Sequence, residues 1–257
     1  MTLANARFDF DHIAIAATDT APALRFLTGA LGGTVIFGGQ SIGFRPMQVW
    51  VGDQAGNGMA VELLEPWEPE RNDFLARFVE RRGDGPHHLT FKVPSLDDAL
   101  ERARAAGATP VKVDTSDPEW KEAFLMPRDA HGTVVQLAES DGDFGTRAQL
   151  LEYVAANGPN SHPRWWVDPL PASAAPAQLR RVVLGTPTLD ATVSFFADFL
   201  EGEIEAKRDG RVELVWPRGA RIAIEHRPDK PPGVDRLEVA GLAEPVELIG
   251  AHLVPAP

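Results

Sequence analysis

The chain has 257 residues and carries a formal net charge of −12, with 37 Asp and Glu against 25 Lys and Arg. An acidic chain repels a phosphate backbone, so we expect no nucleic-acid partner. The sequence contains no cysteine, which excludes disulfides and thiolate metal sites. No apolar run approaches the length of a membrane span and the first residues lack a signal-peptide core, so we expect no membrane partner and a cytoplasmic location.

A first unit of strand, helix and three strands is predicted near the N-terminus. Residues 10–16 alternate as in a strand, and Thr18-Asp-Thr20 with Pro22 favours a helix start directly after it. The helix is expected to end at Gly32-Gly33. Three strands follow, at about 34–38, 46–52 and 58–64. The unit therefore has the order β-α-β-β-β.

The same unit recurs after a charged helix over 67–83. A strand at 87–93 leads into a helix that starts at Ser95, and strands follow near 109–113, 121–126 and 133–138. A shift of 76 residues lays His12 on His88. An internal repeat at a fixed offset predicts repeated structural modules.

The rest of the chain divides in two. Residues 144–178 favour a helix near 147–156 and then a Pro/Ala-rich linker that contains Trp165-Trp166. From residue 179 a third unit appears at an offset of 169. We therefore predict an α+β fold of repeated βαβββ modules, with one domain over 1–143 (modules at about 8–66 and 84–140), the 144–178 segment, and a degenerate third module over 179–257.

Four polar residues fall at matching places of the first two modules. His12 and His88 lie in the first strand of each, and Glu62 and Gln136 lie among apolar neighbours in the last strand, where a polar side chain is costly unless paired. Two imidazoles, one carboxylate and one amide oxygen suit a divalent metal. For each residue alone, a structural role is the simpler interpretation, and we interpret His87 and His131 as structural or rim residues.

The repeat resembles the vicinal-oxygen-chelate superfamily, which includes glyoxalase I, bleomycin-resistance proteins and extradiol dioxygenases. Residues 10–139 look most like the methylmalonyl-CoA epimerase branch. The resemblance is carried by residues 11–16 (DHIAIA), 61–66 (VELLEP), 83–93 (GDGPHHLTFKV) and 124–137, which include Phe124-Leu-Met-Pro and His131-Gly-Thr-Val-Val-Gln-Leu. It implies a glyoxalase-like domain over residues 1–143.

The resemblance also implies roles for the four residues. His12 and His88 match the two histidine ligands of the epimerase-like pattern. Glu62 stands where that branch has a glutamine, and Gln136 stands where a glutamate implicated in catalysis is expected. Because an amide cannot act as a base, the epimerase reaction by its usual mechanism is not expected here.

Three functions remain open. The leading hypothesis is a metal-dependent lyase or isomerase that acts on a small oxygen-rich or acyl-thioester substrate, with His12, Glu62, His88 and Gln136 on an iron, cobalt, nickel, zinc or manganese ion and Glu62 as acid/base. The others are a non-haem iron dioxygenase and a ligand-binding or resistance protein without catalysis. In the third module Arg181 replaces His12 and Ile222 replaces Glu62, so we expect an architectural role there. Exposed strand edges favour a homodimer.

Overall fold

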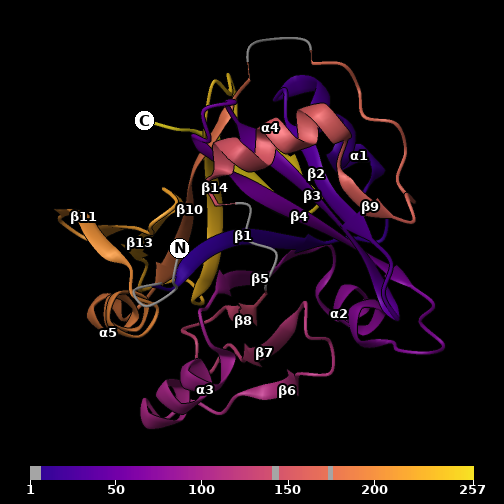
Figure 1. Ribbon diagram of the computed structural model, residues 1–257. Coiled ribbons are helices and arrows are strands. Elements are labelled where there is room, and N and C mark those ends of the chain that lie inside the picture. The colour runs from indigo at the N-terminus through magenta and orange to yellow at the C-terminus, as the bar shows by residue number, and fades with distance from the viewer. Residues whose placement is uncertain (1–6, 141–144, 173–175) are drawn as a thin grey trace. The chain divides into compact units, whose positions relative to one another are not determined.

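The computed structural model describes residues 7–140, 145–172 and 176–257. The described strands form two sheets, of nine strands in the order β6-β7-β8-β5-β1-β4-β3-β2-β9 and of seven strands in the order β11-β12-β13-β10-β14-β16-β15 (Figure 1). The mixed α+β class that the sequence predicts is therefore confirmed. The boundary predicted between residues 143 and 144 lies outside the described residues.

The order of strand, helix and three strands recurs along the described chain. The first such set is β1 (Asp9–Ala16), α1 (Ala21–Arg25) continued by the π-helix η1 (Phe26–Ala30), β2 (Thr34–Gly39), β3 (Gly43–Gly52) and β4 (Gly58–Trp67). After α2 (Phe74–Arg82), the second is β5 (Gly85–Lys92), α3 (Leu96–Ala105), β6 (Val111–Asp114), β7 (Lys121–Leu125) and β8 (Val134–Glu139). After α4 (Arg147–Asn157) and β9 (Asn160–His162), the third is β10 (Gln178–Thr186), α5 (Leu189–Ser194) with η2 (Phe195–Phe199), β11 (Glu203–Arg208), β12 (Arg211–Val215) and β13 (Arg221–His226). The chain ends with β14 (Gly233–Ala240), β15 (Val246–Leu248) and β16 (Ala251–Pro255).

The two π-helical turns support the sequence offset of 169. η1 begins at Phe26 and η2 at Phe195, and each closes with a backbone N–H five residues on that donates to the phenylalanine carbonyl, Leu31 in one case and Leu200 in the other. An α-helix would use the carbonyl four residues back, so the wide turn is an uncommon local feature. The same irregularity at the same place in both sets indicates one structural template.

The described chain separates into two compact units. One contains residues 7–11, 88–140 and 181–235, and the other contains residues 12–87, 145–172, 176–180 and 236–257. In the first unit an aromatic core joins residues of distant strands, because the Phe91 ring lies 5.1 Å from Phe10 and 5.4 Å from Trp216. Burying aromatic side chains of this size dominates the energetics of such a core.

In the second unit, strand pairing places polar and apolar residues on one face of the sheet. β1 pairs with β4 in parallel, with Ala14 opposite Glu62, and β4 pairs antiparallel with β3, with Glu62 opposite Gln48. Alternation puts His12 and Ala16 on the Ala14 side. The opposite face carries fully apolar residues, among them Ile13, Ile15, Val61 and Leu63.

Two helices cover the ends of the face that carries Glu62. Leu151 and Val154 of α4 pack with Trp50 and Ala60 at one end. Leu75 of α2 packs with Ala14, Ala16 and Leu64 at the other, joined by Phe74 and Phe78. The 145–172 segment therefore contributes a helix to the core of this unit, and β9 pairs in parallel with β2.

The strands of the third set pair as those of the first set do. This pairing shows which residue of the third set takes the place of Glu62. Val183 of β10 lies opposite Ala223 of β13, as Ala14 lies opposite Glu62. Val183 matches Ala14 at the offset of 169, so its strand partner Ala223 takes the place of Glu62, and the expectation of Ile222 was wrong by one residue. Ile222 instead has no exposed surface and faces the apolar side.

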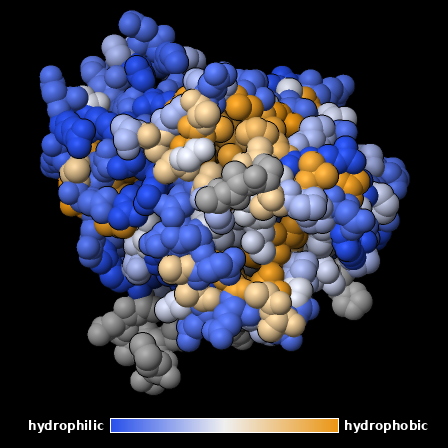
Figure 2. Space-filling model, turned by 90° about the horizontal axis from the view of Figure 1, so that it is seen from above, coloured by the Kyte–Doolittle hydropathy of each residue, from blue (hydrophilic) through white to orange (hydrophobic). Residues whose placement is uncertain are grey.

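Hydrophilic and hydrophobic side chains are unevenly distributed on the face drawn in Figure 2. Figure 2 shows hydrophilic side chains over most of the edge of one face, with hydrophobic side chains gathered nearer its middle. No helix in the described part of the chain is long and apolar enough to cross a membrane.

Replacing Glu139 by Gln tests how β8 holds the start of α3. The Leu96 backbone N–H donates to Glu139 at 2.7 Å, and this bond, with Lys121, lowers the pKa of the Glu139 carboxyl. A carboxyl whose pKa is lowered by folding stabilises the fold above its unfolded pKa, and that contribution is lost as the pH falls through the folded value. We expect the variant to lose about 1 kcal/mol of unfolding free energy at pH 7, and to match wild type near pH 3, by urea denaturation.

The matched control is Glu119→Gln, which removes the same charge from an exposed residue nearby. It should change stability by less than about 0.5 kcal/mol at either pH. An equal loss in the Glu139 variant at both pH values would show that the carboxylate charge does not stabilise α3.

Candidate metal centre

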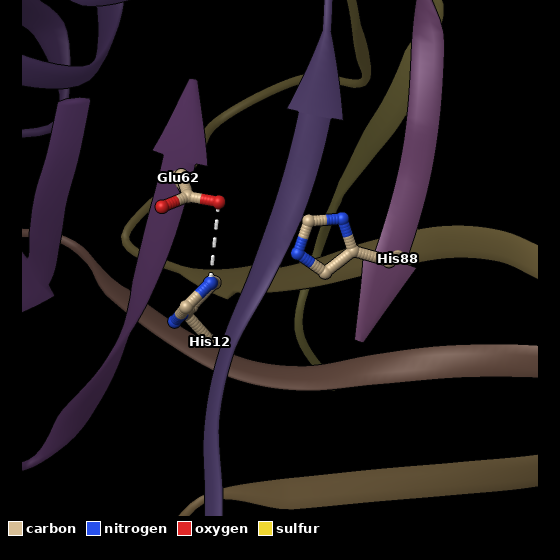
Figure 3. Close-up of side chains that lie close together, drawn as sticks. All are labelled: His12, Glu62 and His88. Carbon is tan, nitrogen blue, oxygen red and sulfur yellow. Dashed lines mark ion pairs between the residues drawn. The ribbon is translucent and has the colours of Figure 1, made fainter. Parts of the chain in front are cut away.

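His12 and Glu62 face each other inside the second unit. His12 is 1% exposed and Glu62 is 7% exposed. The Nε2 atom of His12 lies 3.3 Å from Oε2 of Glu62 (Figure 3). Both side chains leave neighbouring parallel strands on the same face, so the register alone brings them together.

Gln48 completes this pair and was not identified from the sequence. Its Nε2 donates to Oε1 of Glu62 at 3.3 Å and lies 3.4 Å from Nδ1 of His12. Gln48 therefore lies against both the carboxylate of Glu62 and the imidazole of His12. Gln48 stands between apolar residues in β3, the same signal that singled out Glu62 and Gln136.

The apolar contacts of α4 and α2 lie on both sides of this polar group along the sheet. These helix contacts cover the sheet face on both sides of His12 and Glu62 and so bury the imidazole and the carboxylate. A buried charge is costly unless it is paired, and here the imidazole and the amide supply the partners. The low exposure also reduces the water that competes for the ligand atoms.

His88 is the third candidate ligand and lies on β5, 6% exposed. Its ring meets Phe124 edge to face with 6.0 Å between centroids. His12, Glu62 and His88 each offer one ligand atom, and these three atoms all lie within 4.8 Å of one another (Figure 3). This buried group could hold a metal ion, since its donor set of two imidazoles and one carboxylate suits divalent transition metals.

Gln136, the fourth predicted ligand, is 6% exposed on β8 opposite Thr90 of β5. Its Oε1 accepts from the Thr90 hydroxyl at 2.6 Å, and its Nε2 donates to Oε2 of Glu122 at 2.6 Å. The amide is thus fixed by two hydrogen bonds, and its role as a ligand stays a prediction. Glu122, on β7, was not identified from the sequence.

His87 and His131 make structural contacts. The His87 ring packs edge to face on Phe78 at 4.6 Å. His131 adopts a positive φ of 51° and its Nδ1 lies 3.2 Å from the Thr192 hydroxyl. Burial lowers the pKa of the His131 imidazole, because desolvation disfavours its charged form.

Comparison with known proteins gives a consistent set of relatives. The model of the Glyoxalase/Bleomycin resistance protein/Dioxygenase superfamily matches residues 11–124. The uncharacterized protein YqjC of Bacillus subtilis is 30% identical over 138 residues, which are 52% of this chain and 93% of the relative.

Among solved structures, a hypothetical protein from Staphylococcus aureus is 13% identical, covers 97% of this chain and 99% of its own, and has a TM-score of 0.64. It therefore shows the same fold over nearly the whole length. Methylmalonyl-CoA epimerase from Mycobacterium tuberculosis is 25% identical, covers 54% of this chain and 93% of its own, and has a TM-score of 0.45.

Replacing Gln136 by Glu tests the amide contact. The variant would place two carboxylates at the 2.6 Å contact with Glu122, and like charges at this distance repel unless one takes a proton. We expect the unfolding free energy to fall by about 1–3 kcal/mol at pH 8, and by clearly less at pH 5, where one carboxyl can be protonated. Urea denaturation at both pH values checks this. Equal destabilisation at the two pH values would contradict the electrostatic explanation.

Proposed function

Because the chain belongs to the glyoxalase, bleomycin-resistance protein and dioxygenase superfamily, as its sequence predicts, we propose that it is a metal-dependent lyase or isomerase. Its substrate is a small oxygen-rich molecule or an acyl thioester, activated at a carbonyl. The observation that carries this proposal is the buried group of His12, Glu62 and His88, whose three ligand atoms lie within 4.8 Å of one another.

The donor set fits a first-row transition metal. Imidazole nitrogen suits iron, cobalt, nickel and zinc, and a carboxylate oxygen suits manganese as well. Gln136 is the proposed fourth donor, through its amide oxygen. A divalent ion in this place would polarise the substrate carbonyl or stabilise the enolate that forms when a neighbouring carbon loses a proton.

The protein's own residues orient these donors. Gln48 donates to Glu62 and lies against Nδ1 of His12, so it holds both side chains as an outer partner. Such partners of metal ligands fix the orientation of the ligand side chains. Glu62 is the carboxylate that the sequence nominates for proton transfer. Since one of its oxygens accepts from Gln48 and the other faces His12, we assign it first to ligation and to proton transfer only when one of these contacts is released.

A dioxygenase is the second candidate, favoured by one observation. Two histidines and one carboxylate are the donor set of non-haem iron oxygenases, which leave open positions for substrate and oxygen. The two candidates differ in oxygen use. Iron-loaded protein given catechol should consume no oxygen if the lyase or isomerase assignment is right, and steady consumption measured with an oxygen electrode would favour the dioxygenase.

Metal content is the first test of the proposed site. We expect wild-type protein, purified untagged without chelator and reconstituted with Co²⁺ or Zn²⁺, to retain about one equivalent of metal by elemental analysis after desalting. His88→Ala and Glu62→Ala should each retain less than about a fifth under the same conditions, since each removes one of three strong donors.

His87→Gln is the matched control, because it removes the adjacent imidazole, which packs on Phe78. It should bind metal as wild type does. Wild-type protein that retains no metal after reconstitution would refute the enzyme proposal and leave a ligand-binding protein without a metal. Equal metal content in all four proteins would refute the site.

A further inference from the structure

The face of the first unit that carries His88 continues as a polar surface across three strands. On β5, alternation puts Thr90 on the side of His88, and pairing places Gln136 of β8 opposite Thr90 and Phe124 of β7 opposite Gln136. Glu122 lies two residues before Phe124 and so shares this face. The reverse face carries fully buried apolar residues, among them Leu89, Phe91, Val135 and Leu137.

Glu122 is held in place by two hydrogen-bond donors on one of its oxygens. The amide of Gln136 donates to Oε2 at 2.6 Å, and the indole Nε1 of Trp120 donates to the same atom at 2.8 Å. The Gln136 amide in turn is oriented by Thr90, which donates to its oxygen. Because a carboxylate only accepts and the threonine hydroxyl here donates, this chain of contacts has one consistent orientation.

The other oxygen of Glu122 is left available. Among the described residues, no hydrogen bond reaches Oε1, and the side chain is only partly buried. Glu62 contrasts with it, because Gln48 donates to one oxygen of Glu62 and the other faces His12. Of the two carboxylates, Glu122 is the one with an anchored oxygen and an oxygen without a partner.

We propose that Glu122, positioned by Gln136 and Trp120, is the residue that transfers the proton, while Glu62 keeps its contacts and its place as a ligand. The inference rests on the proposed lyase or isomerase function. Oε1 removes a proton from the carbon beside the substrate carbonyl: the carbon–hydrogen bond breaks, an oxygen–hydrogen bond forms on Glu122, and the electron pair moves to the carbonyl oxygen as an enolate. An isomerase then returns a proton from the Glu122 carboxyl to carbon, so no other reactant is consumed, and a carboxyl hydrogen that exchanges with solvent before this return leaves a solvent hydrogen on the substrate.

This assignment also explains the amide at position 136. A glutamate there would set two carboxylates against each other at the present 2.6 Å contact, which is unfavourable unless one is protonated. A glutamine instead donates to Glu122 and fixes its orientation. β8 therefore carries an amide, Gln136, where the resemblance leads one to expect a carboxylate, and the carboxylate is supplied by Glu122 on β7.

Deuterium exchange tests the proposal. Cobalt-reconstituted protein is incubated in D₂O with two probes, methylmalonyl-CoA and the hemithioacetal of methylglyoxal and glutathione, and incorporation at the carbon beside the carbonyl is followed by mass spectrometry. We expect Glu122→Gln to slow the wild-type exchange rate by about 10²- to 10⁴-fold. Its metal content and melting temperature should stay close to wild type, because a glutamine keeps the side-chain volume.

Two further variants separate proton transfer from a structural role. Glu122→Asp keeps a carboxylate and should recover part of the exchange rate that Glu122→Gln loses. Glu119→Gln, an exposed carboxylate of the same segment, should exchange as wild type does.

The outcomes distinguish this inference from the function on which it rests. Wild-type exchange that persists unchanged in Glu122→Gln would overturn the role of Glu122 and leave the proposed function standing. Metal-loaded wild type that exchanges neither probe would overturn both. Loss of exchange together with loss of metal or of the folded state in Glu122→Gln, with Glu122→Asp no better, would show a structural role and refute proton transfer.

Discussion

The pairing register of β1, β4 and β3 is the constraint on which the candidate site depends. It sets Ala14, Glu62 and Gln48 in one row across the sheet, with His12 on the same face. A slip of β4 by one residue would turn Val61 or Leu63 toward the polar face and bury Glu62 in the apolar one. Because both errors are costly, the apolar packing of the reverse face fixes the position of the ligand atoms before any metal binds.

The third set of strands shows that this register does not by itself create a metal site. There Arg181 stands in the place of His12, Ala223 in that of Glu62 and Glu213 in that of Gln48. The Nε of Arg181 lies 2.8 Å from Glu213, and Arg211 contacts the same carboxylate at 3.0 Å. Ion pairs thus satisfy the polar groups of this face among themselves. The first and third sets thus place residues at equivalent positions of the sheet, but only the side chains of the first set provide metal ligands.

Local patterns were sufficient to predict the strands that carry His12, Glu62 and His88, because alternation is a short-range property. They missed Gln48 and Glu122, whose importance comes from cross-strand neighbours that no single strand reveals. They placed Ile222 where Ala223 lies, since a gap within the loops between strands shifts the alignment without changing the hydrophobic pattern. The packing of α4 beside the site could not be predicted from the sequence either. An amphipathic pattern indicates that one face of a helix is buried, but it does not identify the residues that bury it.

Gln136 illustrates why one residue is a poor guide to lost activity. The sequence resemblance leads one to expect a catalytic carboxylate at position 136. The amide found there suggests, when it is considered without its neighbours, that the usual proton transfer is absent. In the structure the same amide lies between a hydroxyl and a carboxylate, and only one of its two orientations satisfies both neighbours. The substitution therefore fixes the direction of Glu122 on the adjacent strand. Whether such a site can transfer a proton depends on Gln136 and Glu122 together. The strand register brings these two residues into contact although they are 14 positions apart in the sequence.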